Sequence, residues 1–306
     1  MRFAVMGAGA VGGYYGALLA RAGNAVTFVA RGAHLEAIRD KGLTVKSWKG
    51  DFHLPEVKVT DEPAEVGPVD CILFAVKAYD TEAAARQMAP IVGPETAVLS
   101  LQNGVESEEI LAIHFGMGSV LGGLAFISAV IESPGVIAHT AAGGLTFGEM
   151  DGDLSERGRR LQALFEAAGI ESKLTSDIQN GLWTKLIWNA CFNPLTTITG
   201  ANVQEILEIP ESLEVARAAM AEVAQVARAC GVELAEDVVD KMVEATRGLG
   251  PITSSMRHDW GAGKPLEAHA LSGVVVDRGR AHGVPTPVNA TLYAALRLME
   301  RGRDGE

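Results

Sequence analysis

The feature that most constrains the fold is a glycine-rich turn set directly between a predicted strand and a predicted helix. Residues 2–6 are mostly apolar, and the sequence Gly7-Ala8-Gly9-Ala10-Val11-Gly12 follows them and opens the helix. In dinucleotide-binding units the first glycine allows a tight turn, the second lets the backbone approach a pyrophosphate, and the third permits close packing of helix on strand. Free N–H groups at the helix start would bind the anion. The motif predicts a dinucleotide site; the alternative is a glycine-rich turn without a ligand.

The first half of the chain alternates short apolar runs with helical patterns, which is typical of a parallel sheet with crossover helices. The predicted strands are residues 2–6, 25–30, 69–76, 96–101, 120–128, 136–140 and 145–148, and the predicted helices are residues 10–22, 35–41, 81–88, 106–114 and 154–168. The last strands follow one another without helices, so we expect an antiparallel far edge. The fold class is therefore α/β, with an N-terminal Rossmann-type doubly wound sheet in a dinucleotide-binding domain of residues 1–175.

The second half of the chain changes to long helical patterns with apolar residues three and four positions apart. The predicted helices are residues 211–230, 235–247, 266–282 and 287–301. We therefore expect a C-terminal all-α domain over residues 176–306 that carries the substrate and catalytic groups. The long apolar helices of this domain would allow the protein to form a homodimer.

The composition excludes several classes of partner. The chain has 26 Lys and Arg against 38 Asp and Glu, a net charge of -12, which argues against binding nucleic acid or an anionic membrane surface. Three cysteines without metal-like spacing predict neither a disulfide framework nor a metal site. The uncharged run 3–20 holds five glycines and two tyrosines, too many for a signal peptide core, and the apolar run 120–131 is too short to span a membrane. The sequence therefore predicts a cytoplasmic protein.

The end of the second predicted strand indicates which dinucleotide binds. An NAD site would place an acid there to hold the ribose hydroxyls, but this chain has Arg31. Because a guanidinium can grip a phosphate with two hydrogen bonds, Arg31 predicts NADP(H) as the cofactor. The alternative is a surface arginine beside a loop. The nearby His34 is left without a role.

Two further strands end in residues that suit the same crevice. Lys77 closes the strand 69–76, and Asn103 follows the strand 96–101. Ligands of open α/β sheets lie outside the carboxyl ends of the strands, so we expect Gly7, Arg31, Lys77 and Asn103 to line one edge. Each could be ordinary loop chemistry by itself, but together they favour a bound dinucleotide.

A single lysine stands in the most apolar part of the second half. Lys185 carries the one charge between Asp177 and Glu205. Asn189 and Asn193 follow it at intervals of four and so share its helix face, and we expect the helix to end at Asn193 because a proline follows. Such a face could bind a carboxylate and a carbonyl, and the Lys185 ammonium could protonate a developing alkoxide. The alternative is a structural lysine with two capping asparagines.

Glu267 heads a later predicted helix. By itself it is a carboxylate that stabilises the helix dipole.

Six motifs together resemble the ketopantoate reductase family, also called the 2-dehydropantoate 2-reductases. The motifs are Gly7-Ala8-Gly9-Ala10-Val11-Gly12, Val76-Lys77-Ala78, Asn103-Gly104-Val105, Trp183-Thr184-Lys185-Leu186-Ile187-Trp188-Asn189-Ala190, Asn193-Pro194-Leu195-Thr196 and Ser254-Ser255-Met256. The resemblance spans the chain and implies NADPH-dependent reduction of 2-dehydropantoate, a small-molecule 2-oxo acid, to (R)-pantoate on the route to pantothenate and coenzyme A. It implies that Lys185 is the general acid, that Asn103, Asn189, Asn193 and Ser255 contact substrate, and that Asn103 also touches the cofactor. It also implies that Glu267 is catalytic and interacts with the reacting hydroxyl or with the nearby cofactor.

The chain departs from the family pattern around the substrate residues. Ile252 stands near a common asparagine, Arg257 and His258 replace a usual Leu-Gln pair, and His269 and Ser272 replace an acidic residue and an asparagine. Arg257 could favour a more anionic oxo acid or could be a solvated helix residue. Two alternatives therefore stay open: reduction of another branched 2-oxo acid to a D-2-hydroxy acid, and a non-catalytic NADP(H)-binding sensor.

Overall fold

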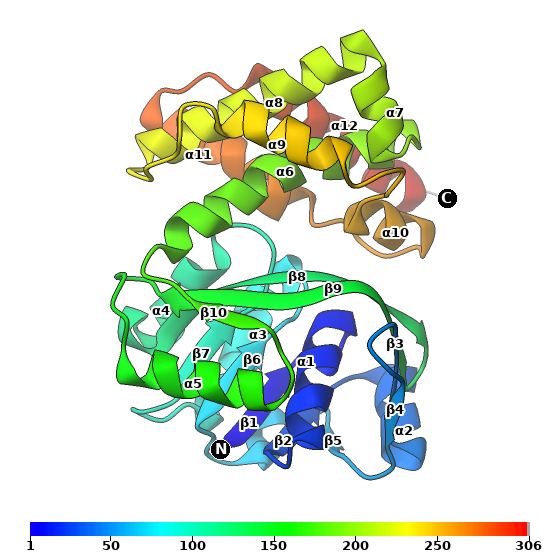
Figure 1. The fold of residues 1–306 in the computed structure, drawn as a ribbon, viewed down its shortest axis with the longest axis vertical. Helices are drawn as coiled ribbons and strands as arrows, with labels where there is room; N and C mark the ends of the chain where they lie inside the picture. Colours follow the sequence, from blue (N-terminus) through cyan, green and yellow to red (C-terminus); the bar gives the residue numbers. More distant parts are fainter. Residues whose placement is uncertain (305–306) are drawn as a thin grey trace. The chain divides into compact units, whose positions relative to one another are not determined.

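The computed structural model describes residues 1–304 and divides the chain into two compact units (Figure 1). The first unit comprises Met1–Gln102 and Ser107–Ile178. The second comprises Asn103–Glu106 and the chain from Gln179 onward, so the helical part begins at residue 179 rather than at 176. A four-residue segment of the first half also belongs to the second unit, which the sequence did not predict.

The first unit is built on one sheet of ten strands with the order β4-β3-β9-β8-β7-β6-β1-β2-β5, and β10 pairs with β9 beside this path. The strands are β1 (Arg2–Met6), β2 (Ala25–Val29), β3 (Leu43–Ser47), β4 (Phe52–Leu54), β5 (Lys58–Thr60), β6 (Cys71–Phe74), β7 (Ala97–Ser100), β8 (Val120–Ser133), β9 (Val136–Glu149) and β10 (Ser172–Leu174). The strands from β8 through β5 pair in parallel. This confirms the predicted α/β class.

Helices cover both faces of this sheet, and each face has its own apolar core. The helices are α1 (Ala10–Arg21), α2 (Gly32–Lys41), α3 (Thr81–Met88), α4 (Ser107–Phe115) and α5 (Glu156–Ala167). Successive residues of a strand point to opposite faces, so Phe3 and Val5 of β1 pack with residues of α1, α2 and α5, whereas Ala4 and Met6 pack with residues of α3 and α4. The sheet is therefore doubly wound, as predicted.

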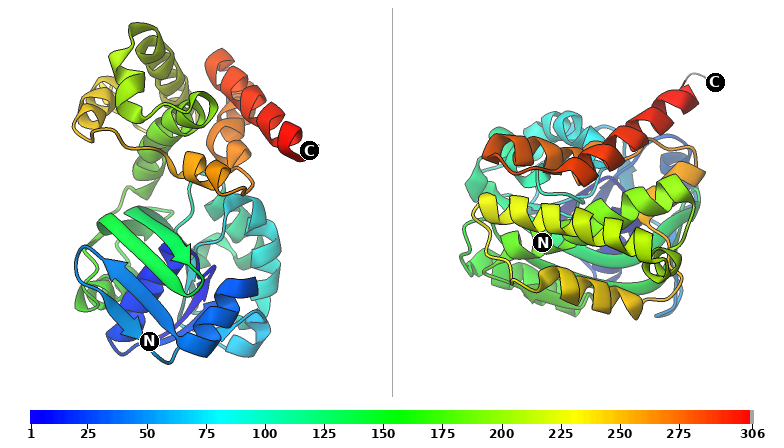
Figure 2. Two further views of the ribbon diagram at one scale, coloured as in Figure 1. Left: turned by 90° about the vertical axis from the view of Figure 1, so that its right-hand side faces the viewer. Right: turned by 90° about the horizontal axis from the view of Figure 1, so that it is seen from above.

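The antiparallel part of the sheet differs from the prediction in one respect. β8 and β9 form a long antiparallel ribbon (Figure 2), and β3 pairs antiparallel with β4 but parallel with β9. The predicted strands 136–140 and 145–148 are one strand, β9. Register shifts along the ribbon and the positive φ of Ala142 accommodate the residues between them without ending the pairing.

The second unit consists of helices. They are α6 (Ile178–Thr199), which starts at the boundary, α7 (Val203–Glu208), α8 (Pro210–Ala229), α9 (Val238–Arg247), α10 (Ser255–Gly261), α11 (Val274–His282) and α12 (Pro287–Asp304), with a π-helical turn at His269–Gly273. Helix α8 packs against α7, α9, α11 and α12. The short helices α7 and α10 and the π turn were not predicted. In the described part of the chain, no helix is both long and apolar enough to cross a membrane.

The prediction that α6 ends at Asn193 is wrong. The helix continues to Thr199 with Pro194 in its interior. An interior proline costs about 3 kcal/mol because it removes one backbone donor. The neighbouring side chains of Phe192 and Leu195 are buried, and burial of a large apolar side chain contributes about 1.5–3 kcal/mol each, so tertiary packing outweighs the local cost.

Candidate active site

The three glycines of the turn have the geometry that a tight turn, the approach of a ligand and close helix packing require. Gly7 has φ +95°, and a Cβ atom there would lie 2.9 Å from the backbone of Ala75. A Cβ atom at Gly12 would lie 2.3 Å from the Gly7 carbonyl oxygen, so only glycine allows α1 to pack this closely. A Cβ atom at Gly9 would meet no atom within 4 Å, which leaves its backbone open to a ligand.

The backbone donors of this turn fall into two groups. The N–H groups of Gly7 and Ala8 both donate to the Val29 carbonyl, at 3.2 and 2.9 Å, so they hold the turn to β2. The first intrahelical bond runs from Gly13 N–H to the Gly9 carbonyl, at 2.8 Å. The N–H groups of the first helical turn, Ala10 to Gly12, have no acceptor within the helix, and this turn carries no acidic residue. These three groups and the helix dipole suit an anion.

The predicted cofactor side chains of the first unit follow the strands next to this turn. β1 lies between β2 and β6, so the chain reverses its direction of winding at β1, which is where ligands of such sheets bind. Arg31 follows β2, is exposed, and donates from Nη2 to Gln87 Oε1 at 3.0 Å. Lys77 follows β6 and is half-buried. Gln102, beyond β7, donates to the Val76 carbonyl at 3.0 Å and ties these strand ends together.

Asn103 does not join this group within one unit. The segment Asn103–Glu106 belongs to the second unit, whereas Gly7, Arg31 and Lys77 belong to the first. Gly104 has φ +99°, and a Cβ atom there would lie 2.9 Å from the Ala270 carbonyl oxygen. Glu106 Oε2 lies 3.3 Å from His269 Nε2. These contacts hold the segment against the π-helical turn.

The second unit brings the predicted asparagines and serine together. Lys185, Asn189 and Asn193 lie on successive turns of α6, and Lys185 is half-buried. Asn193 is 1% exposed; its Nδ2 donates to Asn189 Oδ1 at 3.2 Å, and its Oδ1 accepts from Met256 N–H at 3.2 Å and from Ser255 Oγ at 3.4 Å. Asn193 therefore joins α6 to the start of α10 and orients the amide of Asn189.

Glu267 lies just before the π-helical turn and is buried. The preceding residue, Leu266, donates its N–H to Glu300 Oε1 of α12 at 2.9 Å, which fixes the backbone beside the carboxylate. π-helical turns are frequent at functional sites. No residue pattern in the sequence predicted this one.

The departures from the family pattern have local partners. Arg257 Nη1 donates to the Ala201 carbonyl at 2.8 Å, just beyond the end of α6, so this half-buried side chain ties α10 to the end of α6. His258 Nε2 lies 3.0 Å from Thr253 Oγ1. Ile252 is 37% exposed.

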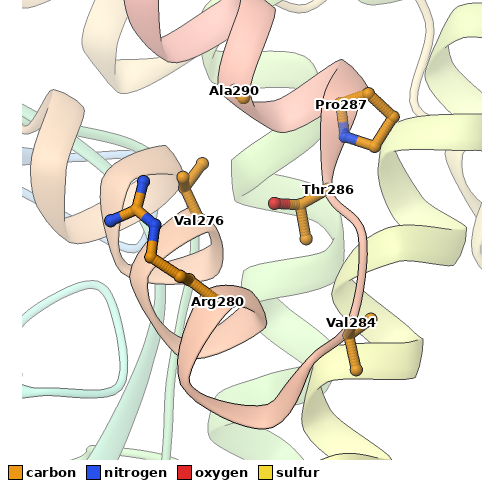
Figure 3. A pocket seen from close by; sticks show the side chains of 6 residues that line it. All are labelled: Val276, Arg280, Val284, Thr286, Pro287 and Ala290. Carbon is orange, nitrogen blue, oxygen red and sulfur yellow. The ribbon is translucent and has the colours of Figure 1, made fainter.

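A pocket of about 360 Å³ lies elsewhere in the second unit, between the ends of α11 and α12 (Figure 3). Its lining residues are Val276, Arg280, Val284, Thr286, Pro287 and Ala290. None of the predicted site residues lines it. Within residues 1–304, no group of three or more His, Cys, Asp or Glu side chains could hold a metal ion.

Comparison with known proteins identifies relatives over the whole chain. The family described as "Ketopantoate reductase PanE/ApbA" matches residues 3–152, and "Ketopantoate reductase PanE/ApbA C terminal" matches residues 177–300. The 2-dehydropantoate 2-reductase of Archaeoglobus fulgidus is 37% identical over 304 residues, which cover 98% of this chain and 98% of that protein.

Solved structures agree with these matches. A crystal structure of 2-dehydropantoate 2-reductase from Geobacter metallireducens GS-15 superposes with a TM-score of 0.93 at 37% identity, covering 98% of this chain and 100% of that one. A D-mandelate dehydrogenase bound to NADH and anilino(oxo)acetate has a TM-score of 0.92 over 99% of both chains. At 22% identity this second likeness concerns the fold alone.

Proposed function

Because the chain belongs to the ketopantoate reductase family of oxidoreductases, we propose that it reduces 2-dehydropantoate to (R)-pantoate with NADPH. This reaction is a step on the route to pantothenate and coenzyme A. The observation that carries the proposal is the polar face of α6, where Lys185 precedes two buried asparagines in a largely buried helix. The asparagines bond to each other and to the start of α10, so this face is held in one arrangement that suits a polar ligand.

The first unit supplies the groups for the cofactor. The free N–H groups of Ala10, Val11 and Gly12 suit the pyrophosphate, and the open side of Gly9 leaves room for it. Arg31 takes the position of the acid in NAD sites, and its guanidinium suits a 2′-phosphate. NADPH, when bound, supplies the hydride.

The second unit supplies the groups for the oxo acid. Reduction of a ketone creates an alkoxide, which needs a proton and a positive neighbour. We assign both tasks to the Lys185 ammonium. Asn189 and Ser255, held by Asn193, suit the carboxylate and hydroxyl groups of the substrate, and Glu267 suits the reacting hydroxyl. We assign Asn103 to contacts with both the cofactor and the substrate.

A second candidate is reduction of another branched 2-oxo acid to a D-2-hydroxy acid. The replacements at His269 and Ser272, close to Glu267, favour it because they change the residues beside the substrate groups. The bond from Arg257 to Ala201 removes one argument for a more anionic substrate.

A panel of 2-oxo acids tested with NADPH and with NADH separates these candidates. We expect the highest kcat/KM for 2-dehydropantoate with NADPH, measured by loss of nicotinamide absorbance. A higher kcat/KM for another branched oxo acid would establish the second candidate. Tight NADPH binding without oxidation by any acid would instead identify a sensor.

A further inference from the structure

The imidazole of His34 on α2 is bonded at both ring nitrogens, and both bonds lead to parts of the first unit that surround the glycine-rich turn. Nε2 lies 2.9 Å from the carbonyl oxygen of Ala8, inside the turn. Nδ1 accepts the N–H of Gly135 at 3.1 Å. Gly135 lies in the tight connection between β8 and β9 and has φ +78°.

These two bonds define one protonation state. A backbone N–H can only donate, so Nδ1 must carry a lone pair and the ring proton must be on Nε2, which donates to Ala8. Burial lowers the pKa of His34, which favours this neutral ring. An imidazolium would place a second N–H against the Gly135 N–H.

The hydrogen bond from His34 engages the second backbone group of Ala8, a residue of the glycine-rich turn. The Ala8 N–H donates to the Val29 carbonyl at 2.9 Å, and its carbonyl accepts from His34. Both backbone groups of Ala8 are therefore engaged, directly before Gly9 and the free donors of α1. The direction in which the N–H groups of α1 point depends on the conformation of the glycine-rich turn that precedes them.

The bond to Gly135 anchors the imidazole itself. The Gly135 carbonyl accepts the N–H of Thr44 on β3 at 2.9 Å, so the connection it lies in is tied to the sheet. A Cβ atom at Gly135 would lie 3.2 Å from the Cβ atom of Ala37, which leaves little room for the connection to move relative to α2. The ring is thus held from a second side while it bonds to Ala8.

We propose that His34 is a positioning residue for the dinucleotide, which holds the Ala8 carbonyl so that the N–H groups at the start of α1 keep the orientation that binds the pyrophosphate. The inference rests on the proposed use of NADPH. It assigns His34 no contact with the cofactor. Its effect should therefore fall on cofactor affinity and leave the chemical step unchanged.

Three substitutions separate the two bonds. His34→Gln keeps a donor for Ala8, His34→Asn keeps an acceptor for Gly135 but is too short to reach Ala8, and His34→Leu removes both. We expect His34→Leu and His34→Asn to weaken NADPH binding at least about 5-fold, the lower end of the cost of a buried acceptor left without a donor. We expect His34→Gln to stay within about 2-fold of the wild type, because the bond that matters is retained. Titration calorimetry with NADPH measures all three.

Turnover adds a second readout. With saturating NADPH the kcat of His34→Leu should equal that of the wild type while the KM for NADPH rises. The matched control is His53→Leu, which removes a histidine bonded to the Thr44 side chain at 2.9 Å at the exposed position of β4. His34→Leu binding NADPH as tightly as the wild type, or His34→Gln losing as much affinity as His34→Leu, would overturn the inference.

Hydrogen exchange of the free protein keeps this test independent of the proposed function. The amides of Gly7, Ala8 and Gly13, which are hydrogen-bonded in this turn, should exchange faster in His34→Leu and His34→Asn than in the wild type and in His34→Gln, without any cofactor present. Unchanged exchange would overturn the inference even if NADPH binds. Faster exchange in a protein that binds no NADPH would refute the proposed function and leave the positioning of the turn intact.

Discussion

The two units build their parts of the candidate site from different groups. In the first unit the proposed anion site consists of backbone N–H groups at the start of α1, and close contacts at Gly7 and Gly12 place them. In the second unit the site consists of side chains on α6 that are bonded to one another, such as Asn193 to Asn189. One part depends on the position of a helix, the other on the identity of buried side chains.

This difference implies two patterns of sensitivity. A site made of backbone donors should tolerate changes of side chain but not changes of volume that shift the helix. A site made of bonded side chains should lose function when one group changes, even if the volume is kept. Substitutions in the two units should therefore separate cofactor affinity from chemistry.

The largest effect is expected for Lys185→Ala. Loss of a general acid reduces turnover by about 10²- to 10⁴-fold. The Kd for NADPH should stay near the wild-type value, because the cofactor groups assigned to the first unit are unchanged. Steady-state turnover and a binding titration measure the two quantities.

The matched control is Lys173→Ala, on the exposed position of β10. It should leave both turnover and affinity unchanged. Near-normal turnover of Lys185→Ala would remove the lysine from the mechanism, and a large loss of NADPH affinity would break the separation between the units.

Two glycine substitutions test the first unit. Gly12→Ala forces a contact of 2.3 Å with the Gly7 carbonyl, so α1 must shift, at a cost of about 1–3 kcal/mol in the free energy of unfolding, and NADPH affinity should fall at least about 10-fold. Gly9→Ala meets no protein atom within 4 Å, so it should weaken NADPH binding and leave stability unchanged. Urea unfolding and titration distinguish the two. Equal stability losses would show that Gly9 serves the fold and not a ligand.

Sequence patterns predicted the elements whose local signals agree with their packing. Helix α3 spans Thr81–Met88, as its pattern indicates, and β1, β2 and β6 lie where apolar runs precede glycine or charged residues. The prediction failed where packing overrides a local signal. Pro194 predicted a helix end, but the buried residues around it continue the helix.

The site residues show the same limit. Spacing alone placed Lys185, Asn189 and Asn193 on one helix face, because helix geometry is local. The bond from Ser255 to Asn193 joins residues 62 positions apart, and only the motif resemblance associated them. No pattern could assign Asn103 to the second unit or give His34 its two bonds, since both depend on how distant segments pack.

A smaller effect is expected for Arg31→Ala. One charge-assisted contact at an exposed position should be worth about 10-fold in NADPH affinity and less than about 2-fold in NADH affinity, because only NADPH carries the 2′-phosphate. Gln87→Ala is the matched control, since it removes the Arg31 partner but keeps the charge. Equal losses for both cofactors would refute the phosphate assignment and make Arg31 a general contributor to the first unit.

The smallest effect concerns pH and is confined to the first unit. Burial lowers the pKa of His34 and of His139, so both rings bind protons more readily in the unfolded chain than in the folded protein. The unfolded chain then binds more protons, so the free energy of unfolding is highest above the ordinary histidine pKa and decreases as pH falls from that pKa toward the lowered values. The decrease should be smaller than the cost of Gly12→Ala. Urea unfolding of the wild type, His34→Gln and His139→Gln between pH 7 and pH 5 measures it. Each variant should lose part of the slope, and a full slope in both would contradict burial of these rings as its cause.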